Sequence, residues 1–493
     1  MISLTFTIVA ALLLAAFVVH VKSRIDKRRR YANLPPGPSE KSYIVGPRAY
    51  MKFEELTDKY GSVFSYVYQG DVHVVITRYA AVVDIMQKHS QDLVDRAGTV
   101  GVEIMTGGMK VLTARAGERL KKLRRALHSH LQPVAVRQYS TLQRAHAKTY
   151  ILNLLHQPDQ IVDHAKTYAA SVIMSVTYGK MTPTTYQDST IREVVASLHR
   201  LFEVLHPGQF LVDVFPILRF FPFGGVAKLR KYHQLDIDLF RGQLDVVEEQ
   251  LSKNEATPSF GTYLLEHQED LQLSKNEAAY LAGSMFGAGS DTTATGISFV
   301  AMAAACYPQE VRKVQAQLDI VVGRDRLPTF EDMPFLPRVT AFFFEAHRWR
   351  PISIQGFTHR ATKDIHWNGF TIPSGAIVRG NHWSILHDPE VFPDPETFNP
   401  DRWLDDKGHI REDIKHFGFG FGRRVCPGQH LADRSLFINT AMLLWAFDIA
   451  EDPSAPINTM NFTDTANVQV SPFKVKLDPR IEDLERIVDS DLN

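Results

Sequence analysis

The sequence predicts a mainly helical fold with a small β portion, preceded by a transmembrane helix. Helical periodicity dominates from about residue 80 to residue 320 and is broken at intervals by prolines. Stretches rich in β-formers lie on either side, at 60–80 and 352–380, and loops rich in Pro, Asp and Gly fill 387–424. With 493 residues, 44% of them apolar, the chain can bury a large core.

The transmembrane prediction rests on the run 2–21, which contains no Lys, Arg, Asp or Glu. A helix of this length is about 30 Å long and matches the hydrocarbon core of a bilayer. Six basic residues follow within 22–30, so the positive-inside rule places this flank in the cytosol and Met1 in the lumen. A cleaved signal peptide is the alternative, but it would carry its charge before the apolar run.

Three parts of the chain are therefore expected. Residues 1–21 form the anchor, 22–38 a basic flank with a stiff proline-rich spacer at Leu34–Pro38, and 39–493 the globular part. Length alone suggests roughly three domains in the globular part. We expect one, because the motifs described below must converge on a single site.

Composition excludes several classes of function. Lys+Arg and Asp+Glu both number 55, so nothing favours nucleic-acid binding, which requires a basic balance. The chain has two cysteines, Cys306 and Cys426, which argues against a disulfide scaffold. Two cysteines also exclude a four-cysteine iron–sulfur cluster or a cysteine-rich zinc site built within this chain.

Two early stretches have distinct patterns. Residues 63–76 alternate β-formers around Gly70 and predict a hairpin. The apolar stretch Phe202–Gly225 is interrupted by three prolines and contains Phe210, Phe215, Phe220, Phe221 and Phe223. It is too broken to span a bilayer, and it could either dip into a membrane surface or belong to the core.

A long buried helix is predicted over Glu277–Cys306, which has no proline and one charge, Asp291, after Glu277. A second transmembrane helix is the rival interpretation. An Asp at mid-span would cost about 2.5–3.5 kcal/mol there, and several Gly, Ser and Thr residues lower the hydrophobicity further. A helix through the protein centre fits better.

Cys426 lies in the glycine-rich stretch FGFGRRVCPG, residues 419–428. Glycines let backbone N–H groups approach the sulfur, and Arg423 and Arg424 add positive charge, so a thiolate is favoured. The pattern turns helical after Pro427, which puts the sulfur near a helix N-terminus. A lone thiolate with an arginine two residues away suits haem iron, and a buried cysteine in a turn is the alternative.

Four motifs together resemble the cytochrome P450 (haem-thiolate monooxygenase) family, from about Leu34 to the C-terminus. Phe419, Gly422, Arg424, Cys426 and Gly428 match F-x-x-G-x-R-x-C-x-G, and residues 288–293 match the oxygen-activation motif [A/G]-G-x-[D/E]-T-[T/S]. Residues 345–348 supply E-x-x-R, and 398–403 resemble the second-arginine motif. The resemblance implies the fold of this family, with its long helix over the haem.

By resemblance, the cofactor is haem b, and Cys426 is its axial ligand. Phe419 and Gly428 shape the loop, and the residues that would contact the propionates are Arg424, Arg124, Arg96 and His359. Leu120 stands where the family usually has tryptophan, so Lys121 could take over as a point charge. A solvated helix face or a surface role is the alternative for Arg124, Arg96 and His359.

The remaining motifs imply a proton relay and a structural triad. Oxygen activation consumes protons, and an acid beside an alcohol, Asp291 and Thr292, can deliver them. Glu345, Arg348 and Arg402 are expected to form a buried charge triad. By family position, the residues expected to contact substrate are Met109, Phe210, Met285, Phe286, Ile352, Gln355 and Val468.

The sequence thus predicts a haem-dependent monooxygenase that inserts one oxygen atom of O2 into a lipophilic small molecule. No G-x-G-x-x-G fingerprint follows a strand, so electrons must come from a partner, and the resemblance implies an NADPH-dependent flavoprotein reductase. A basic docking face could comprise Lys121, Lys122, Arg125, Lys415 and Arg423.

The sequence also predicts where the protein is located. The anchor and the resemblance imply a single pass through the endoplasmic reticulum membrane, with membrane lipid as a partner and a cytosolic catalytic domain. Residues 426–433 and 387–390 look like those of fungal specialised-metabolism members. The alternatives are an O2-independent isomerase or dehydratase of the same family and a non-catalytic haem carrier.

Overall fold

The computed structural model describes residues 33–38, 48–68, 70–181, 188–206 and 208–490. Its α-helices are α2 (Ala49–Tyr60), α3 (Tyr79–Val82), α4 (Val100–Thr106), α5 (Glu118–Leu131), α6 (Ser140–His156), α7 (Ile161–Tyr178), α8 (Ser189–Leu205), α9 (Leu211–Val214), α10 (Val226–Ser252), α11 (Phe260–Glu266), α12 (Lys275–Cys306), α13 (Pro308–Val321), α14 (Pro337–Trp349), α15 (His382–Leu386), α16 (Gln429–Ala446) and α17 (Leu484–Ser490). Its strands are β1 (Val63–Tyr68), β2 (Asp71–Ile76), β3 (Asp95–Arg96), β4 (His359–Arg360), β5 (Ile365–Trp367), β6 (Phe370–Ile372), β7 (Ile377–Gly380), β8 (Phe447–Glu451) and β9 (Val475–Pro479). The prediction of a mainly helical fold with a small β portion is confirmed.

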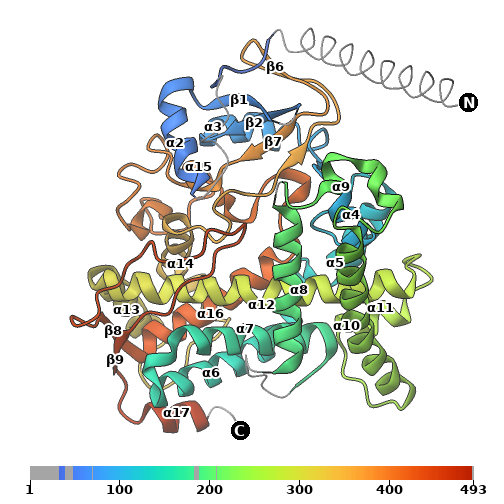
Figure 1. The fold of residues 1–493 in the computed structure, drawn as a ribbon. Helices are drawn as coiled ribbons and strands as arrows, with labels where there is room; N and C mark the ends of the chain where they lie inside the picture. Colours follow the sequence, from blue (N-terminus) through green and yellow to red (C-terminus); the bar gives the residue numbers. More distant parts are fainter. Residues whose placement is uncertain (1–32, 39–47, 69, 182–187, 207, 491–493) are drawn as a thin grey trace, which may run out of the picture.

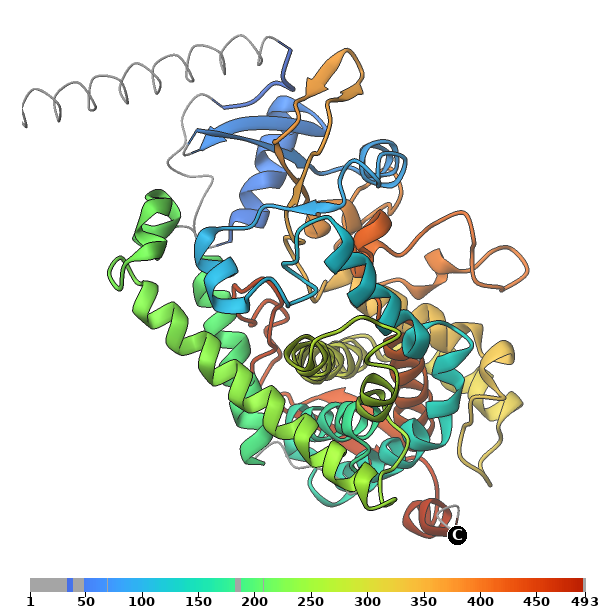
Figure 2. The same ribbon diagram turned by 90° about the vertical axis from the view of Figure 1, so that its right-hand side faces the viewer.

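The central helix is α12, which runs across the middle of the molecule and is seen end-on in Figure 2. A capping box starts it, since Ser274 and Glu277 each bond the other's backbone N–H. Glycines let neighbouring helices pack closely: a Cβ on Gly283 would lie 2.1 Å from Phe240 of α10. The predicted long buried helix is confirmed, and it begins two residues earlier than expected.

The main sheet has the strand order β1-β2-β7-β4-β3 and lies at one side of the helical part (Figure 1). The predicted hairpin is confirmed as β1 and β2, which pair antiparallel from Val63↔Ile76 to Tyr68↔Asp71. The short strand β3 pairs with β4 so that Arg96 lies opposite His359. This pairing brings together two basic residues that are 263 positions apart (359 − 96).

The proline-rich segment is docked on the sheet at its C-terminal end. The backbone N–H of Ser65 in β1 donates to Pro36 (2.9 Å), and its hydroxyl donates to Pro35 (2.6 Å). A Cβ on Gly37 would lie 1.7 Å from the Ser65 carbonyl oxygen, so only glycine allows this approach.

The predicted transmembrane helix and basic flank, up to residue 32, lie outside the described residues. Within the part of the chain that the structure describes, no helix is both long and apolar enough to cross a bilayer.

Candidate active site

Cys426 occupies a loop between two short 3-10 turns, Phe417–Phe419 and Gly422–Arg424, and the start of α16. Its backbone N–H donates to the carbonyl of Phe419 (2.9 Å). Gly422 has φ 53°, and a Cβ there would lie 2.4 Å from the Cβ of Ser90, so the turn requires glycine. The loop is thereby folded back on itself beside α16.

The Cys426 side chain is accessible although protein surrounds it on most sides. This side chain is exposed, yet the protein around it is dense enough that burial raises the pKa of the thiol. Both facts hold if the thiol faces an internal cavity. The backbone N–H of Gly428 and the charge of Arg124 act in the opposite direction and favour the thiolate. Cys306 differs, because burial raises the pKa of its thiol to about 12.

The central helix has accessible residues in its middle. Ala288 is exposed although α12 is otherwise largely buried, and Asp291 and Thr292 are half-buried. Ala288 and Thr292 are four residues apart and share a face. This face of α12 is therefore accessible in the middle of the helix.

Asp291 and Thr292 have separate partners. The Nε2 of Gln469 donates to Oδ2 of Asp291 (3.1 Å), and the Thr292 hydroxyl donates to the Ala288 carbonyl (2.6 Å). Burial raises the pKa of the Asp291 carboxyl, and the bond from Gln469 partly offsets that. Sequence reasoning missed Gln469, because 178 positions separate it from Asp291.

Four basic residues gather near the Cys426 loop: Arg96, Arg124, Arg424 and His359. The Arg424 guanidinium donates to the carbonyls of Val94 (2.6 Å), Val111 (3.2 Å) and Ala114 (2.5 Å). Arg124 donates to the Val425 carbonyl at 3.1 Å. All these acceptors are neutral.

The remaining two members, Arg96 and His359, also bond only to backbone carbonyls. Arg96 donates to those of Leu112, Phe357 and Thr358, and Nδ1 of His359 bonds that of Leu93 (2.6 Å).

This basic cluster lacks a carboxylate of its own. Burial, then Arg424 and Arg124, lower the pKa of Arg96 to about 9. Burial, then Arg96, lowers the pKa of His359 to about 3. The adjacent carboxylate, Asp95, is paired with Arg115 at 2.8 Å. Among the described residues, no carboxylate lies within ion-pair distance of Arg96, Arg124 or Arg424.

This donor set fits haem. A haem brings four nitrogen ligands and two carboxylates, so the protein needs one axial ligand and nearby positive charge. Cys426 and the basic cluster supply both. Within the described ranges, no three His, Cys, Asp or Glu side chains form a group that could hold a metal ion by themselves.

Lys121 does not join the basic cluster. Its ammonium is on the surface and pairs with Glu118 at 2.6 Å. Leu120 is buried in the apolar core. The structure therefore turns Arg124 inward and Lys121 outward, so the expected replacement of a propionate contact by Lys121 is not seen.

The Glu345 carboxylate is the centre of a buried group. It accepts from Arg348 (2.8 and 2.9 Å), from Nε of Arg402 (3.1 Å), from the indole N–H of Trp403 (2.9 Å) and from the backbone N–H of Asn399 (2.9 Å). Glu345 and Arg348 are fully buried. The structure thus brings the three residues of the expected triad together.

Aromatic contacts connect this triad with the cysteine loop. The ring of Trp403 lies 5.5 Å from that of His416, which lies 6.1 Å from Phe419. Sequence reasoning missed His416, although it immediately precedes the first turn of the loop.

The expected substrate residues fall into two groups. Ile352 and Gln355 are half-buried, and Gln355 accepts a hydrogen bond from Arg379 (2.7 Å). The other five are buried: Met109, Phe210, Met285, Phe286 and Val468. Phe286 packs edge-on against Tyr178 of α7, with ring centres 5.9 Å apart, and Phe210 lies against Gly225. The structure places these two side chains in packed core.

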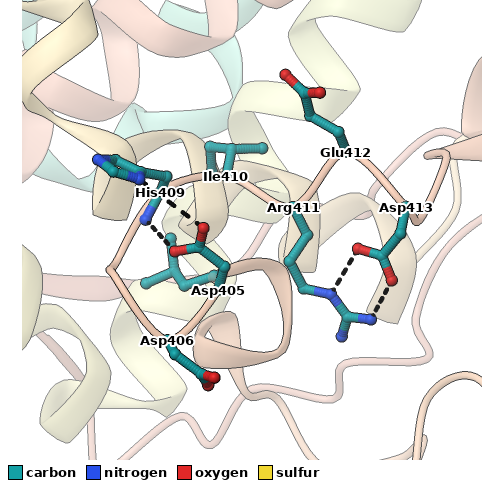
Figure 3. A pocket seen from close by; sticks show the side chains of 8 residues that line it. Asp405, Asp406, His409, Ile410, Arg411, Glu412 and Asp413 are labelled. Carbon is teal, nitrogen blue, oxygen red and sulfur yellow. Dashed lines mark hydrogen bonds and ion pairs between the residues drawn. The ribbon is translucent and has the colours of Figure 1, made fainter.

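A hollow of about 670 Å³ lies elsewhere, on the surface loop after Trp403 (Figure 3). Among its charged groups, Arg411 pairs with Asp413 at 2.5 Å, and His409 lies 3.8 Å from Asp405. It contains none of the predicted site residues.

Comparison with known proteins decides the family. The profile of the family described as Cytochrome P450 matches residues 43–477. The chain belongs to the cytochrome P450 family. The prediction of a cytochrome P450 enzyme is confirmed, and the fold is consistent with this family. Family membership implies haem held by a cysteine thiolate and electrons from a redox partner.

Several fungal P450s resemble the chain over nearly its whole length. Cytochrome P450 monooxygenase 88 of Postia placenta is 52% identical over 94% of both chains. Cytochrome P450 monooxygenase 113 of the same fungus is 50% identical over 95% of both. Cytochrome P450 monooxygenase fogE of Aspergillus ruber is 31% identical over 97% of this chain and 93% of its own.

Proposed function

We propose that this P450 is a haem-thiolate monooxygenase that inserts one oxygen atom of O2 into a lipophilic small molecule. The observation that carries the proposal is the open sulfur of Cys426 beside a basic cluster without a carboxylate. Cys426 would bind the iron, and Arg96, Arg124, Arg424 and His359 would hold the propionates.

Haem supplies iron that activates dioxygen with electrons from outside, and thiolate ligation favours O–O cleavage. The protein's part is to hold and deliver protons. Gln469 occupies Oδ2 of Asp291, which leaves Oδ1 to carry the proton. The raised pKa of this carboxyl favours its protonated form. Thr292 keeps the lone pairs of its hydroxyl oxygen available on the accessible face of α12.

The electron donor that we infer is an NADPH-dependent flavoprotein reductase. Its docking face would be basic and would lie on the Cys426 side. Lys121, Lys415 and Arg423 support this proposal, since all three are exposed. Lys122 is less available, because its side chain is only 25% exposed where it bonds Glu277 at 3.0 Å. Arg125 bonds the Asp270 carbonyl.

The anchor and location remain proposals from the sequence: a single pass through the endoplasmic reticulum membrane at 2–21, with a cytosolic domain from residue 39. An exposed apolar patch around α9 supports a second contact with lipid. Its members are Leu211, Val214, Phe215, Ile217, Phe220, Phe221 and Phe223. Phe210, which was expected with them, is buried instead.

We also propose a role in fungal specialised metabolism. The fungal relatives support a fungal setting, and the motif at residues 426–433 supports the rest. A lipophilic substrate follows from the family.

The first test replaces the ligand. Cys426→Ser is expected to abolish the thiolate-type spectrum of the ferrous carbonyl complex and the activity, because an alcohol is a poor haem ligand. Cys306→Ser is the matched control and should leave the spectrum unchanged. A thiolate-type spectrum retained by Cys426→Ser would refute the proposed function.

The second test addresses proton delivery. Asp291→Asn is expected to slow product formation by about 10²–10⁴-fold, the usual contribution of a positioned acid–base group. Thr292→Ala should still consume NADPH but release more peroxide per product molecule. One assay would measure NADPH oxidised, peroxide released and product formed. Unchanged coupling in both variants would favour the O2-independent alternative.

A further inference from the structure

Lys110 has an unusual environment in the segment between α4 and α5. The side chain is 5% exposed, yet within the described part of the chain no hydrogen bond or ion pair involves its ammonium group. Its Nζ lies 5.7 Å from the centre of the Phe240 ring. Burial lowers the pKa of this ammonium, and Asp236 partly offsets that. The nitrogen atom itself keeps a little accessible surface. A largely buried charge without a partner is costly and calls for an explanation.

The charges around Lys110 do not balance. Asp236 is fully buried and accepts a hydrogen bond from Arg200 (2.9 Å). Its second oxygen, Oδ2, has no partner but is not within ion-pair distance of Lys110. Two cations therefore share one carboxylate, which leaves one positive charge in a buried position. One additional carboxylate would neutralise the group.

The position of Lys110 connects it with the accessible face of α12. Phe240, under the ammonium, rests against Gly283 of α12. The next residue, Ser284, is half-buried, and its hydroxyl has no partner among the described residues. Ser284, Ala288 and Thr292 are spaced by four, so they lie on one face of the helix. Phe240 thus lies between Lys110 and the turn of α12 that carries Ser284, and from Ser284 this face of the helix leads to Thr292.

We propose that Lys110 binds the carboxylate of a lipophilic acid and thereby selects the substrate class of the proposed monooxygenase. This inference rests on the proposed function. Ser284 would add a hydrogen bond to the same group. Thr292 lies eight positions after Ser284, which is a rise of about 12 Å along the helix. The oxidised carbon would therefore be far from the carboxylate, towards the opposite end of the molecule.

The experiment compares acids with their methyl esters in the haem-loaded protein. The probes are linear acids from decanoic to hexadecanoic and a fused-ring diterpene acid, each with its ester. Dissociation constants are measured by the haem spin-state shift and by calorimetry. The wild type is expected to bind at least one acid about 10–100-fold more tightly than its ester, as a charged hydrogen bond would give.

Variants then test whether Lys110 causes the preference for acids over esters. Lys110→Met should lose the preference through weaker acid binding with unchanged ester binding, and Lys110→Arg should retain part of it. Lys253→Met is the control, since Lys253 is exposed directly after α10 and pairs with Glu249. Asp236→Asn tests the charge count without altering Lys110. It should tighten acid binding, because it removes the competing negative charge.

Several outcomes would overturn the proposal. The first is that the wild type binds no acid more tightly than its ester. The second is that Lys110→Met weakens the binding of acid and ester equally. The third is that Asp236→Asn leaves the binding of acids unchanged. Each variant's ferrous carbonyl spectrum is recorded as well. A wild type that has an intact thiolate spectrum but no preference for acids refutes the Lys110 site alone. A wild type that lacks the thiolate spectrum refutes the proposed function.

Discussion

Two groups of buried arginines differ in one respect. Arg348 and Arg402 surround Glu345, whose carboxylate accepts hydrogen bonds from both at 2.8–3.1 Å. Arg96 and Arg424 instead bond only to neutral backbone carbonyls. The triad contains its counter-charge, and the basic cluster does not.

This difference separates a structural group from a binding group. Burying a guanidinium costs several kcal/mol unless an anion accompanies it. The triad meets that condition within the chain, so its role is complete in the polypeptide alone. The basic cluster meets it only when an anionic molecule binds, and the two propionates of haem would satisfy it.

The largest expected effect comes from removing the counter-charge of the triad. Glu345→Gln leaves two buried guanidiniums facing a neutral amide. We expect the free energy of unfolding to fall by about 3–5 kcal/mol, as for other broken buried pairs. Guanidinium denaturation followed by circular dichroism would measure it.

Glu396→Gln is the matched control for that experiment. Glu396 is 70% exposed and lies 3.8 Å from Arg350. Its loss should cost about 0–1 kcal/mol, as is usual for surface pairs. If Glu345→Gln is equally harmless, the distinction between the two groups is wrong.

The basic cluster should make the haem-free protein sensitive to acid. The pKa of His359 falls from 6.5 to about 3 on folding, so the folded protein binds fewer protons than the unfolded chain between these values. The stability from neutral His359 is therefore complete above pH 6.5 and is lost as the pH falls through this window. Between pH 7 and pH 5, this effect of His359 lowers the free energy of unfolding by about 2 kcal/mol.

His359→Gln should remove this contribution to the pH dependence of stability. The loss of unfolding free energy between pH 7 and pH 5 should be smaller in the variant by about 2 kcal/mol, measured by denaturation at both pH values. Other buried histidines are present in both proteins and cancel in the difference. Equal losses would show that His359 is not held neutral by its surroundings.

The smallest effect distinguishes two neighbours on α5. Arg124→Met should weaken haem binding about tenfold, because one charged donor is lost, and should change the stability of the haem-free protein little. Lys121→Met should leave haem binding unchanged, since Lys121 pairs with Glu118 on the surface. Haem transfer to a haem-free globin measures both variants, and equal rates would contradict the assignment.

Much of the site could be predicted from the sequence because its chemistry is local. The glycines and arginines around Cys426 are contiguous, and helical spacing alone puts Glu345 beside Arg348. The absence of proline and the single charge, Asp291, after Glu277 sufficed to predict the central helix. Such features depend on residues a few positions apart, and backbone geometry relates them without knowledge of the fold.

Only the tertiary structure decided which distant residues meet. Pairing of β3 with β4 brings Arg96 to His359, and the loop with Gln469 reaches Asp291. Sequence periodicity shows which face of an element is apolar but not what lies against it. For this reason the sequence suggested both Lys121 and Arg124 for the haem, and packing turned one to solvent and the other inward. The unbalanced charge of Lys110 likewise depends on three elements that meet only in the folded chain.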